Sequence, residues 1–104
     1  MEDEGIVLRR YKEGRRIAYE IISPDKYTRG LLIGTILGND KDFGIYYQSI
    51  EKSSKMRKIG KHKETEASSL DGVLQKKAIE LAKQEFGDLS VSVFDAYTRE
   101  KLAA

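Results

Sequence analysis

The chain lacks cysteine and tryptophan, and it holds one histidine and one proline among its 104 residues. Without cysteine it can form neither a disulfide nor a thiolate ligand, and a single histidine, His62, cannot complete a structural zinc site. The glycines of TRGLLIGTILG do not have the spacing of a phosphate-binding loop, and no serine stands between glycines as in a nucleophile elbow. We therefore expect no metal and no cofactor, and the sequence gives no support for an enzyme.

Long hydrophobic runs are also absent. No stretch approaches the ~20 apolar residues that a membrane-spanning helix needs, so no membrane partner is expected. The first residues, MEDEG, are acidic and no apolar run follows them, which argues against a secretory signal. Together with the absence of cysteine, this favours a cytoplasmic protein. Charged residues make up 35% of the chain while methionine occurs twice, a balance typical of thermophile proteins.

Short hydrophobic runs between turn residues predict strands over much of the chain. A first strand starts at Ile6, and residues 17–22 alternate with a period of two until Pro24, which cannot donate to a ladder. Residues 31–37 form a nearly continuous apolar run, and residues 43–50 follow after a turn. These segments predict two consecutive β-hairpins.

A helix and one more strand are expected in the last third of the chain. Ser68 and Asp71 approximate a capping box, and Gly87 is a suitable residue for ending a helix. Between them, apolar side chains fall on one stripe at helical spacing, namely Leu70, Val73, Leu74, Ala78, Leu81 and Ala82. Residues 89–94 then alternate as a strand, with Val93 and Phe94 on opposite faces.

These patterns predict a single α+β domain over residues 1–104. We expect an antiparallel sheet of four to five strands, in the order β-β-β-β-α-β, with one amphipathic helix packed on one face. Residues 1–4 and 99–104 are expected to be frayed, and residues 51–66 to form a basic loop. Because one helix covers one face only, apolar sheet surface is expected to remain exposed, and such surfaces often mark partners. A homodimer is therefore expected.

Positive charge is concentrated in two segments although the net charge of the chain is only +2. Residues 8–16 carry a local charge of +4, and residues 51–63 carry a local charge of +5. The second segment contains KSSKMRKIGKHK, which has no acidic residue. Lysine, arginine and serine side chains of this kind contact phosphates and supply affinity without reading sequence. The same run would also suit a solvated connector.

The leading hypothesis is a small non-enzymatic protein that binds DNA or RNA through basic loops on a β-sheet scaffold. Aromatic side chains near cationic loops can stack unpaired bases, which makes the two tyrosines before the second segment candidates. The two segments are expected to flank a groove. The predicted contacts are Arg9, Arg10, Lys12, Arg15, Arg16, Tyr46, Tyr47, Lys55, Arg57, Lys58, Lys61 and Lys63.

Two other functions remain open. One is a protein–protein assembly module that forms a homo-oligomer through the sheet. The other is a metal-dependent nuclease, in which Glu20, Asp71 and Asp95 would converge from separate elements to hold divalent cations. The order of strands, helix and strand over residues 17–98, with acids at these places, resembles the ribonuclease H-like fold in topology. It departs from that family where Glu20 stands in place of an aspartate and where the chain ends before later elements.

Overall fold

The computed structural model describes residues 5–36, 42–50, 55–63 and 69–95, without the side chains at positions 13, 62 and 63. The expected fraying of residues 1–4 and 99–104 lies outside the described residues. Six strands and one helix make up the described chain. Their bounds are β1 (Ile6–Glu13), β2 (Arg16–Ile22), β3 (Thr28–Ile36), β4 (Asp42–Ser49), β5 (Arg57–Lys63), α1 (Leu70–Phe86) and β6 (Val91–Asp95).

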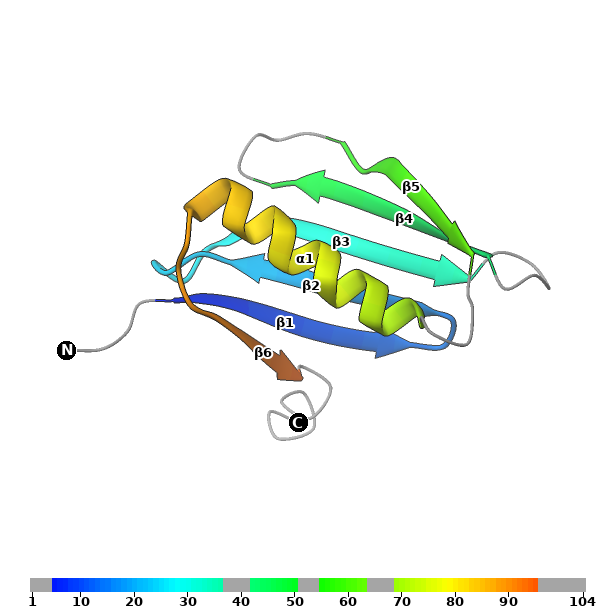
Figure 1. Ribbon diagram of the computed structural model, residues 1–104, viewed down its shortest axis with the longest axis horizontal. Helices are drawn as coiled ribbons and strands as arrows, with labels where there is room; N and C mark the ends of the chain where they lie inside the picture. The colour runs from blue at the N-terminus through cyan, green and yellow to red at the C-terminus, as the bar shows by residue number, and fades with distance from the viewer. Residues whose placement is uncertain (1–4, 37–41, 51–54, 64–68, 96–104) are drawn as a thin grey trace.

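All six strands join one sheet in the order β5-β4-β3-β2-β1-β6 (Figure 1). The first five strands form an antiparallel meander, and β6 pairs in parallel with β1. A parallel neighbour needs a crossover connection, and α1 provides it. The α+β class is confirmed, whereas the expectation of four to five strands, all antiparallel, is wrong. The sheet is mixed because the chain returns across it to the free side of β1.

The sequence did not predict β5, which lies within the basic run. Its residues pair with β4 from Asp42↔Lys63 to Tyr47↔Arg57, with a bulge opposite Ile45 and Tyr46. The expected loop over residues 51–66 is therefore wrong from Arg57 to Lys63. Only one large apolar side chain, Ile59, occurs in this strand, so the alternation that predicts a strand is missing.

The helix packs on one face of the sheet and forms the core with it. The predicted apolar stripe is confirmed: Leu70, Leu74, Ala78 and Ala82 are buried, while Val73 and Leu81 pack at the margin. Facing them are the buried side chains of the sheet, which are Ile6, Leu8, Ile17, Tyr19, Ile21, Leu32, Phe43 and Ile45. Residues of α1 contact β2 and β3 most extensively, so the helix lies over the middle of the sheet.

Both ends of α1 are capped. The Ser69 hydroxyl accepts a hydrogen bond from the Gly72 amide at 3.2 Å, and Gly87, with φ of 84°, donates its N–H to the Lys83 carbonyl at 2.9 Å. The helix end at Gly87 is as predicted. The N-cap is one residue later than predicted, at Ser69 instead of Ser68, so the expected spacing of a capping box to Asp71 does not hold.

The sheet thus has a covered face and an uncovered face, and side chains alternate between them along each strand. We define the covered face by the core residues beneath α1. The uncovered face carries the side chains of opposite parity, and no described helix lies on it. Its members include Val7, Arg9, Tyr11, Arg16, Ala18, Glu20, Leu31, Ile33, Tyr46, Lys58, Lys61 and Phe94. Among the described residues, no helix has the length and hydropathy required to cross a bilayer.

Candidate nucleic-acid interface

The two basic segments lie in the same sheet but not side by side. The first forms β1 and the turn into β2, and the described part of the second forms β5 and the two residues before it. Three strands separate β1 from β5, and at ~4.8 Å per strand spacing the two lie roughly 19 Å apart. We expected the two segments to flank a groove. Instead, the described parts of the two segments are separated by the broad surface of three strands.

Strand alternation divides the predicted cations between the two faces. Arg10 and Lys12 share the parity of the core residue Leu8, and Arg57 pairs with Tyr47, which packs against the core. Arg15 is exposed in the turn between β1 and β2, and Lys55 is exposed before β5. The remaining described cations of the predicted set lie on the uncovered face, namely Arg9, Arg16, Lys58 and Lys61. The side chain of Lys63 is outside the described residues.

The two tyrosines also separate. Tyr46 lies on the uncovered face beside Gly44, where its ring would contact a Cβ on that glycine. Tyr47 packs on the covered face, with its hydroxyl over Gly30. The two tyrosines therefore do not share one face, because adjacent residues of a strand point in opposite directions.

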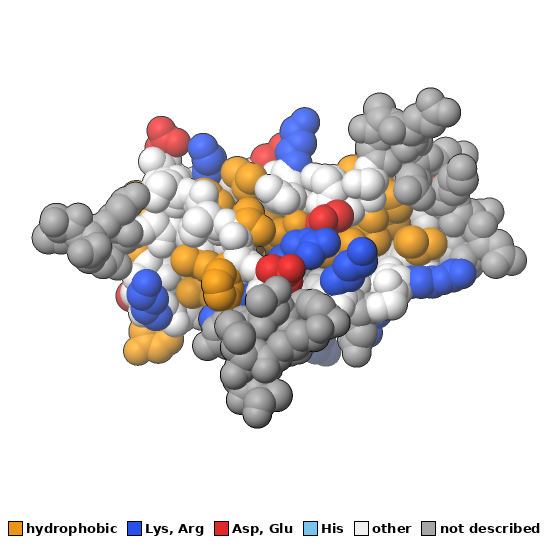
Figure 2. All heavy atoms as spheres, turned by 90° about the horizontal axis from the view of Figure 1, so that it is seen from below, with side chains coloured by type: hydrophobic (Ala, Val, Ile, Leu, Met, Phe, Trp, Pro, Cys, Tyr) orange, Lys and Arg blue, Asp and Glu red, His pale blue; other side chains and the backbone are white. Residues whose placement is uncertain are grey.

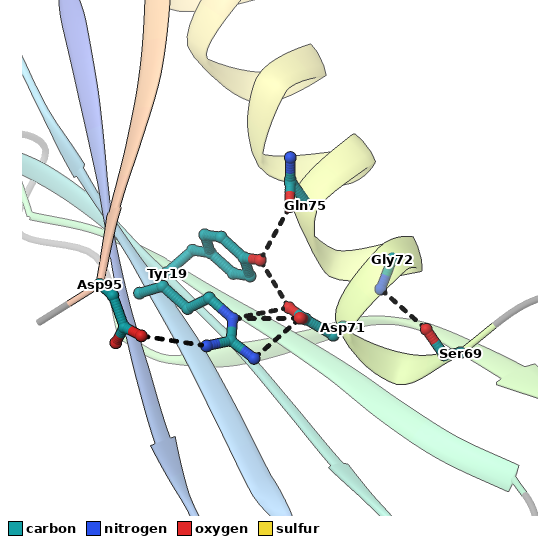
Figure 3. Close-up of polar contacts among 7 residues, drawn as sticks. Tyr19, Ser69, Asp71, Gly72, Gln75 and Asp95 are labelled. Atoms are coloured by element: carbon teal, nitrogen blue, oxygen red, sulfur yellow. Dashed lines mark hydrogen bonds and ion pairs between the residues drawn. The ribbon is translucent and has the colours of Figure 1, made fainter. Parts of the chain in front are cut away.

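A cluster of polar side chains around Asp71 joins α1 to the sheet (Figure 3). Arg10 belongs to this cluster. Its Nε donates to Oδ1 and Oδ2 of Asp71 at 3.0 and 3.1 Å, and its Nη2 lies 2.8 Å from Oδ2. The Tyr19 hydroxyl donates to Asp71 Oδ1 at 2.6 Å, and Asp95 Oδ2 lies 3.9 Å from Arg10 Nη1. A bidentate arginine–carboxylate pair is among the stronger polar contacts in proteins. Arg10 therefore links β1 to α1 through its contacts with Asp71.

The titration of this cluster follows from its environment. Burial alone would raise the pKa of Asp71, but the hydrogen bonds from Arg10 and Tyr19 outweigh it and hold the pKa below its usual value. Burial and the neighbouring carboxylate raise the pKa of the Tyr19 phenol. Asp71 is consequently a stable anion, paired with Arg10.

A second polar cluster lies on the uncovered face around Glu20. Tyr11 donates its hydroxyl to Glu20 Oε1 at 2.8 Å, and Thr28 donates to Oε2 at 2.7 Å. Arg9 Nη1 lies 3.5 Å from the same Oε1 atom. Burial is the main reason that the pKa of Tyr11 is raised. The cluster fixes Tyr11 with its hydroxyl directed toward Glu20 and its ring half-exposed on β1.

The opposite side of the uncovered face is more cationic. Lys58 is the cross-strand neighbour of Tyr46 and is exposed. The Lys61 amine lies 3.4 Å from Asp42 Oδ2, with more than half of the lysine side chain exposed. The described part of this face therefore carries more positive than negative charge. Its cations are Arg9, Arg16, Lys58 and Lys61, and its carboxylates are Glu20 and Asp42.

Two features near these positions were not predicted from the sequence. Phe94 in β6 pairs with Arg9, so this ring, 45% exposed, joins the uncovered face beside Arg9. On the other side of the sheet, a groove of about 690 Å³ lies between α1 and β5 and is bordered by Lys76 and Lys77. Parity in β6 could have indicated the first feature. The second depends on where α1 crosses the sheet, which local patterns do not contain.

The three acids considered for a metal site do not converge. Asp71 and Asp95 lie at the covered face around Arg10, whereas Glu20 lies on the uncovered face with its own hydrogen-bond donors. Within the part of the chain that the structure describes, no group of three acidic or histidine side chains is arranged to hold a metal ion. The arrangement that the nuclease hypothesis requires is therefore not formed by these residues.

No family model, no curated protein and no solved structure matches this chain.

Proposed function

We propose that the protein binds nucleic acid in single-stranded form on the uncovered face of its sheet. The observation that carries this proposal is the placement of Tyr11, Tyr46 and Phe94 on one face together with an excess of cationic side chains. Each ring is partly exposed, and no described helix lies over it.

The aromatic side chains favour single strands over duplexes. Unpaired bases stack on exposed aromatic rings of a sheet, and each such stack is worth about 1–3 kcal/mol. The bases of a duplex are already stacked on one another, so a flat sheet surface gains little from them. Because every base has an aromatic face, such binding has little sequence preference.

The cations of the face supply the electrostatic part of the binding. Lys58 and Lys61 lie on the edge strand and Arg9 lies near the other edge, so a strand crossing the sheet would meet positive charge at both ends. Binding would release counterions, and affinity would fall with salt by roughly 0.7 log unit per log unit of salt for each phosphate contact.

The proposal is tested by fluorescence anisotropy with a labelled single-stranded oligonucleotide and its duplex, over a range of salt concentrations. We expect the single strand to bind more tightly than the duplex. Tyr46→Ala should weaken single-strand binding by about 5–160-fold, as expected for the loss of one stacked base. Lys58→Glu together with Lys61→Glu should reduce the salt slope by roughly 1.4.

Matched controls separate the face from the bulk properties of the chain. Tyr27→Ala removes an aromatic ring that is 66% exposed in the turn between β2 and β3, and it should leave affinity unchanged. Lys76→Glu with Lys83→Glu changes the net charge by the same amount on α1, away from the uncovered face. If the two double variants weaken binding equally, or if no single strand binds at low salt, the proposal is wrong.

A second candidate function rests on the apolar members of the same face. Val7, Ala18, Leu31 and Ile33 are half-buried where no described helix covers them, and two sheets can pack face to face across such a surface. A homo-oligomer formed in this way would occlude Tyr46. Sedimentation that shows self-association lost on Leu31→Lys, with unchanged nucleic-acid affinity, would favour this alternative.

A further inference from the structure

The two edges of the sheet are built differently. β5 carries Arg57, Lys58 and Lys61, and it contains a bulge opposite Ile45 and Tyr46. Cationic side chains and bulges are devices by which proteins keep an edge strand from pairing with another chain. β6, at the other edge, has the sequence VSVFD, without a cation, and it pairs with β1 in an unbroken register. Among the described residues, β5 therefore carries both devices, whereas β6 has neither a cation nor a bulge.

The side chains of β6 add apolar surface to this open edge. Val93 is 43% exposed on the covered face, because α1 lies over the middle of the sheet and not over β6. Phe94 is similarly exposed on the uncovered face. Figure 2, which views the molecule from the side on which β6 lies, shows hydrophobic side chains at the surface beside a group of acidic and basic ones.

The backbone of β6 has a defined polarity along the edge. Ile6 donates its N–H to the Ser90 carbonyl at 2.8 Å, and Ile6 pairs with Val91 in the parallel ladder. In such a ladder the residues on either side of Val91 bond to β1, whereas Val91 and Val93 direct their own N–H and C=O groups away from it. These groups face the side of β6 on which no described strand lies.

We propose that β6 is a self-association edge, and that a second copy of this chain pairs with it in antiparallel register centred on Val93. A twofold axis at Val93 places the outward backbone groups of Val93 opposite those of the same residue in the partner. It also sets Val91 opposite Asp95 and Ser92 opposite Phe94. The two sheets then continue into one another across the axis, an isologous contact of the kind that closes a dimer.

Charge supports a second copy as the occupant. In this register the two Asp95 side chains face valines and not each other, and each Asp95 lies 3.9 Å from Arg10 of its own chain. Pairing two copies through β5 would instead bring its three exposed cations toward the same residues of the partner, which is unfavourable. The self-complementary edge is therefore β6. This inference does not depend on nucleic-acid binding.

Single cysteine variants test the register directly, because the natural chain has no cysteine. A hydrogen-bonded antiparallel pair has its Cα atoms about 5.5 Å apart, within the range that a disulfide bridges. Val93→Cys should therefore give a disulfide-linked dimer, of twice the 11.8 kDa chain mass, under mild oxidation of dilute protein. Leu89→Cys is the matched control: it is also exposed, but its partner position would be roughly 27 Å away, so it should stay monomeric on a non-reducing gel.

Sedimentation of the full chain without cysteine gives the second measurement. We expect a dimer in the wild type and a dissociation constant raised at least tenfold by Val93→Lys or by Val93→Pro. The proline removes an N–H that points away from β1, so it leaves the β1–β6 ladder intact, and circular dichroism should be unchanged. Tyr27→Lys introduces a lysine at another exposed site, where the tyrosine is 66% exposed, and it should leave the dimer unaffected.

Three outcomes would overturn the proposal. They are a wild type that remains monomeric at all concentrations, equal cross-linking of Val93→Cys and Leu89→Cys, and a dimer that cross-links through Ile33→Cys on the uncovered face instead of through β6.

Discussion

Asp71 shows most clearly how the role of a single residue depended on its neighbours in space. The sequence allowed two roles for it: a carboxylate in the first turn of a helix can take part in a cap, and a carboxylate can also bind a divalent cation. In the structure Asp71 accepts hydrogen bonds from Arg10 in β1 and from Tyr19 in β2. These partners lie 61 and 52 residues away along the chain, so no local pattern could have identified them.

We expect Asp71→Asn to lower the free energy of unfolding at pH 7 by about 1–2 kcal/mol. The asparagine keeps an acceptor for Tyr19 but loses the charged bidentate contact, and the estimate is reduced because Asp71 is partly exposed. The pKa of Asp71 in the folded protein is held below its value of about 3.9 in the unfolded chain. The stabilisation that the Asp71 carboxylate gives the fold is therefore fully present above about pH 3.9, and it is lost as the pH falls through the folded pKa. The difference between wild type and variant should therefore shrink below about pH 4.

Urea denaturation of both proteins from pH 3 to pH 7 measures this difference. Asp88→Asn is the control, because Asp88 is exposed and lies 3.5 Å from the Lys83 amine in a surface pair that contributes little. A difference between wild type and Asp71→Asn that stays constant across this range would show that the carboxylate charge does not stabilise the fold.

At the scale of elements, the sequence predicted what periodicity encodes and missed what depends on neighbouring strands. The stripe of α1 and the alternation in β2 and β6 result from one buried face, and those elements were predicted close to their observed bounds. β5 lacks this alternation of apolar and polar residues. It is an edge strand, and its cations keep the exposed edge from pairing with another chain. The pairing of β6 with β1 is set by the crossover of α1, which no local spacing records.

For the candidate site, the same reasoning predicted the residue types but not their faces. Arg9, Tyr46, Lys58 and Lys61 were identified from charge and aromatic content, and they lie on the uncovered face. Arg10 and Tyr47 were identified on the same grounds, and they face the helix or the core. Period-two alternation separates these sets, but only once it is known which parity of each strand α1 covers.

The packing of α1 on β3 depends on Gly34. A Cβ at this position would lie 2.6 Å from one Leu74 methyl group and 2.7 Å from a Leu70 methyl group, and both leucines are buried. We expect Gly34→Ala to lower the free energy of unfolding by about 1–3 kcal/mol, because the helix or the leucines must shift in a filled core. Thermal and urea denaturation measure the effect.

Gly60→Ala is the matched control for this substitution. It changes a glycine of another strand of the same sheet, where a Cβ would meet nothing within 4 Å. Its stability should equal that of the wild type or slightly exceed it. If both alanine variants are equally stable, α1 does not pack against β3 as closely as the structure indicates.

At the scale of the whole molecule, the two proposals concern adjoining surfaces. Phe94 and Arg9 lie on the uncovered face next to the β6 edge, so pairing through Val93 brings both copies of these residues close to the twofold axis. The uncovered face of one copy spans five strand spacings, roughly 24 Å, and the dimer would more than double this width. A nucleic-acid strand could then cross from one copy to the other.

Binding should consequently depend on oligonucleotide length in the dimer and much less in a monomer. A single strand of about 30 nucleotides can reach both copies, and engaging the second copy then becomes an intramolecular step, whereas one of about 12 nucleotides occupies one copy. We expect the wild type to bind the longer strand at least tenfold more tightly than the shorter one, after correction for the larger number of binding positions on the longer strand. Val93→Pro should lose most of this preference and keep its affinity for the shorter strand. Anisotropy titrations with both lengths measure it. If Val93→Pro sediments as a monomer yet retains the full preference, the two faces do not act together, and each copy binds its strand alone.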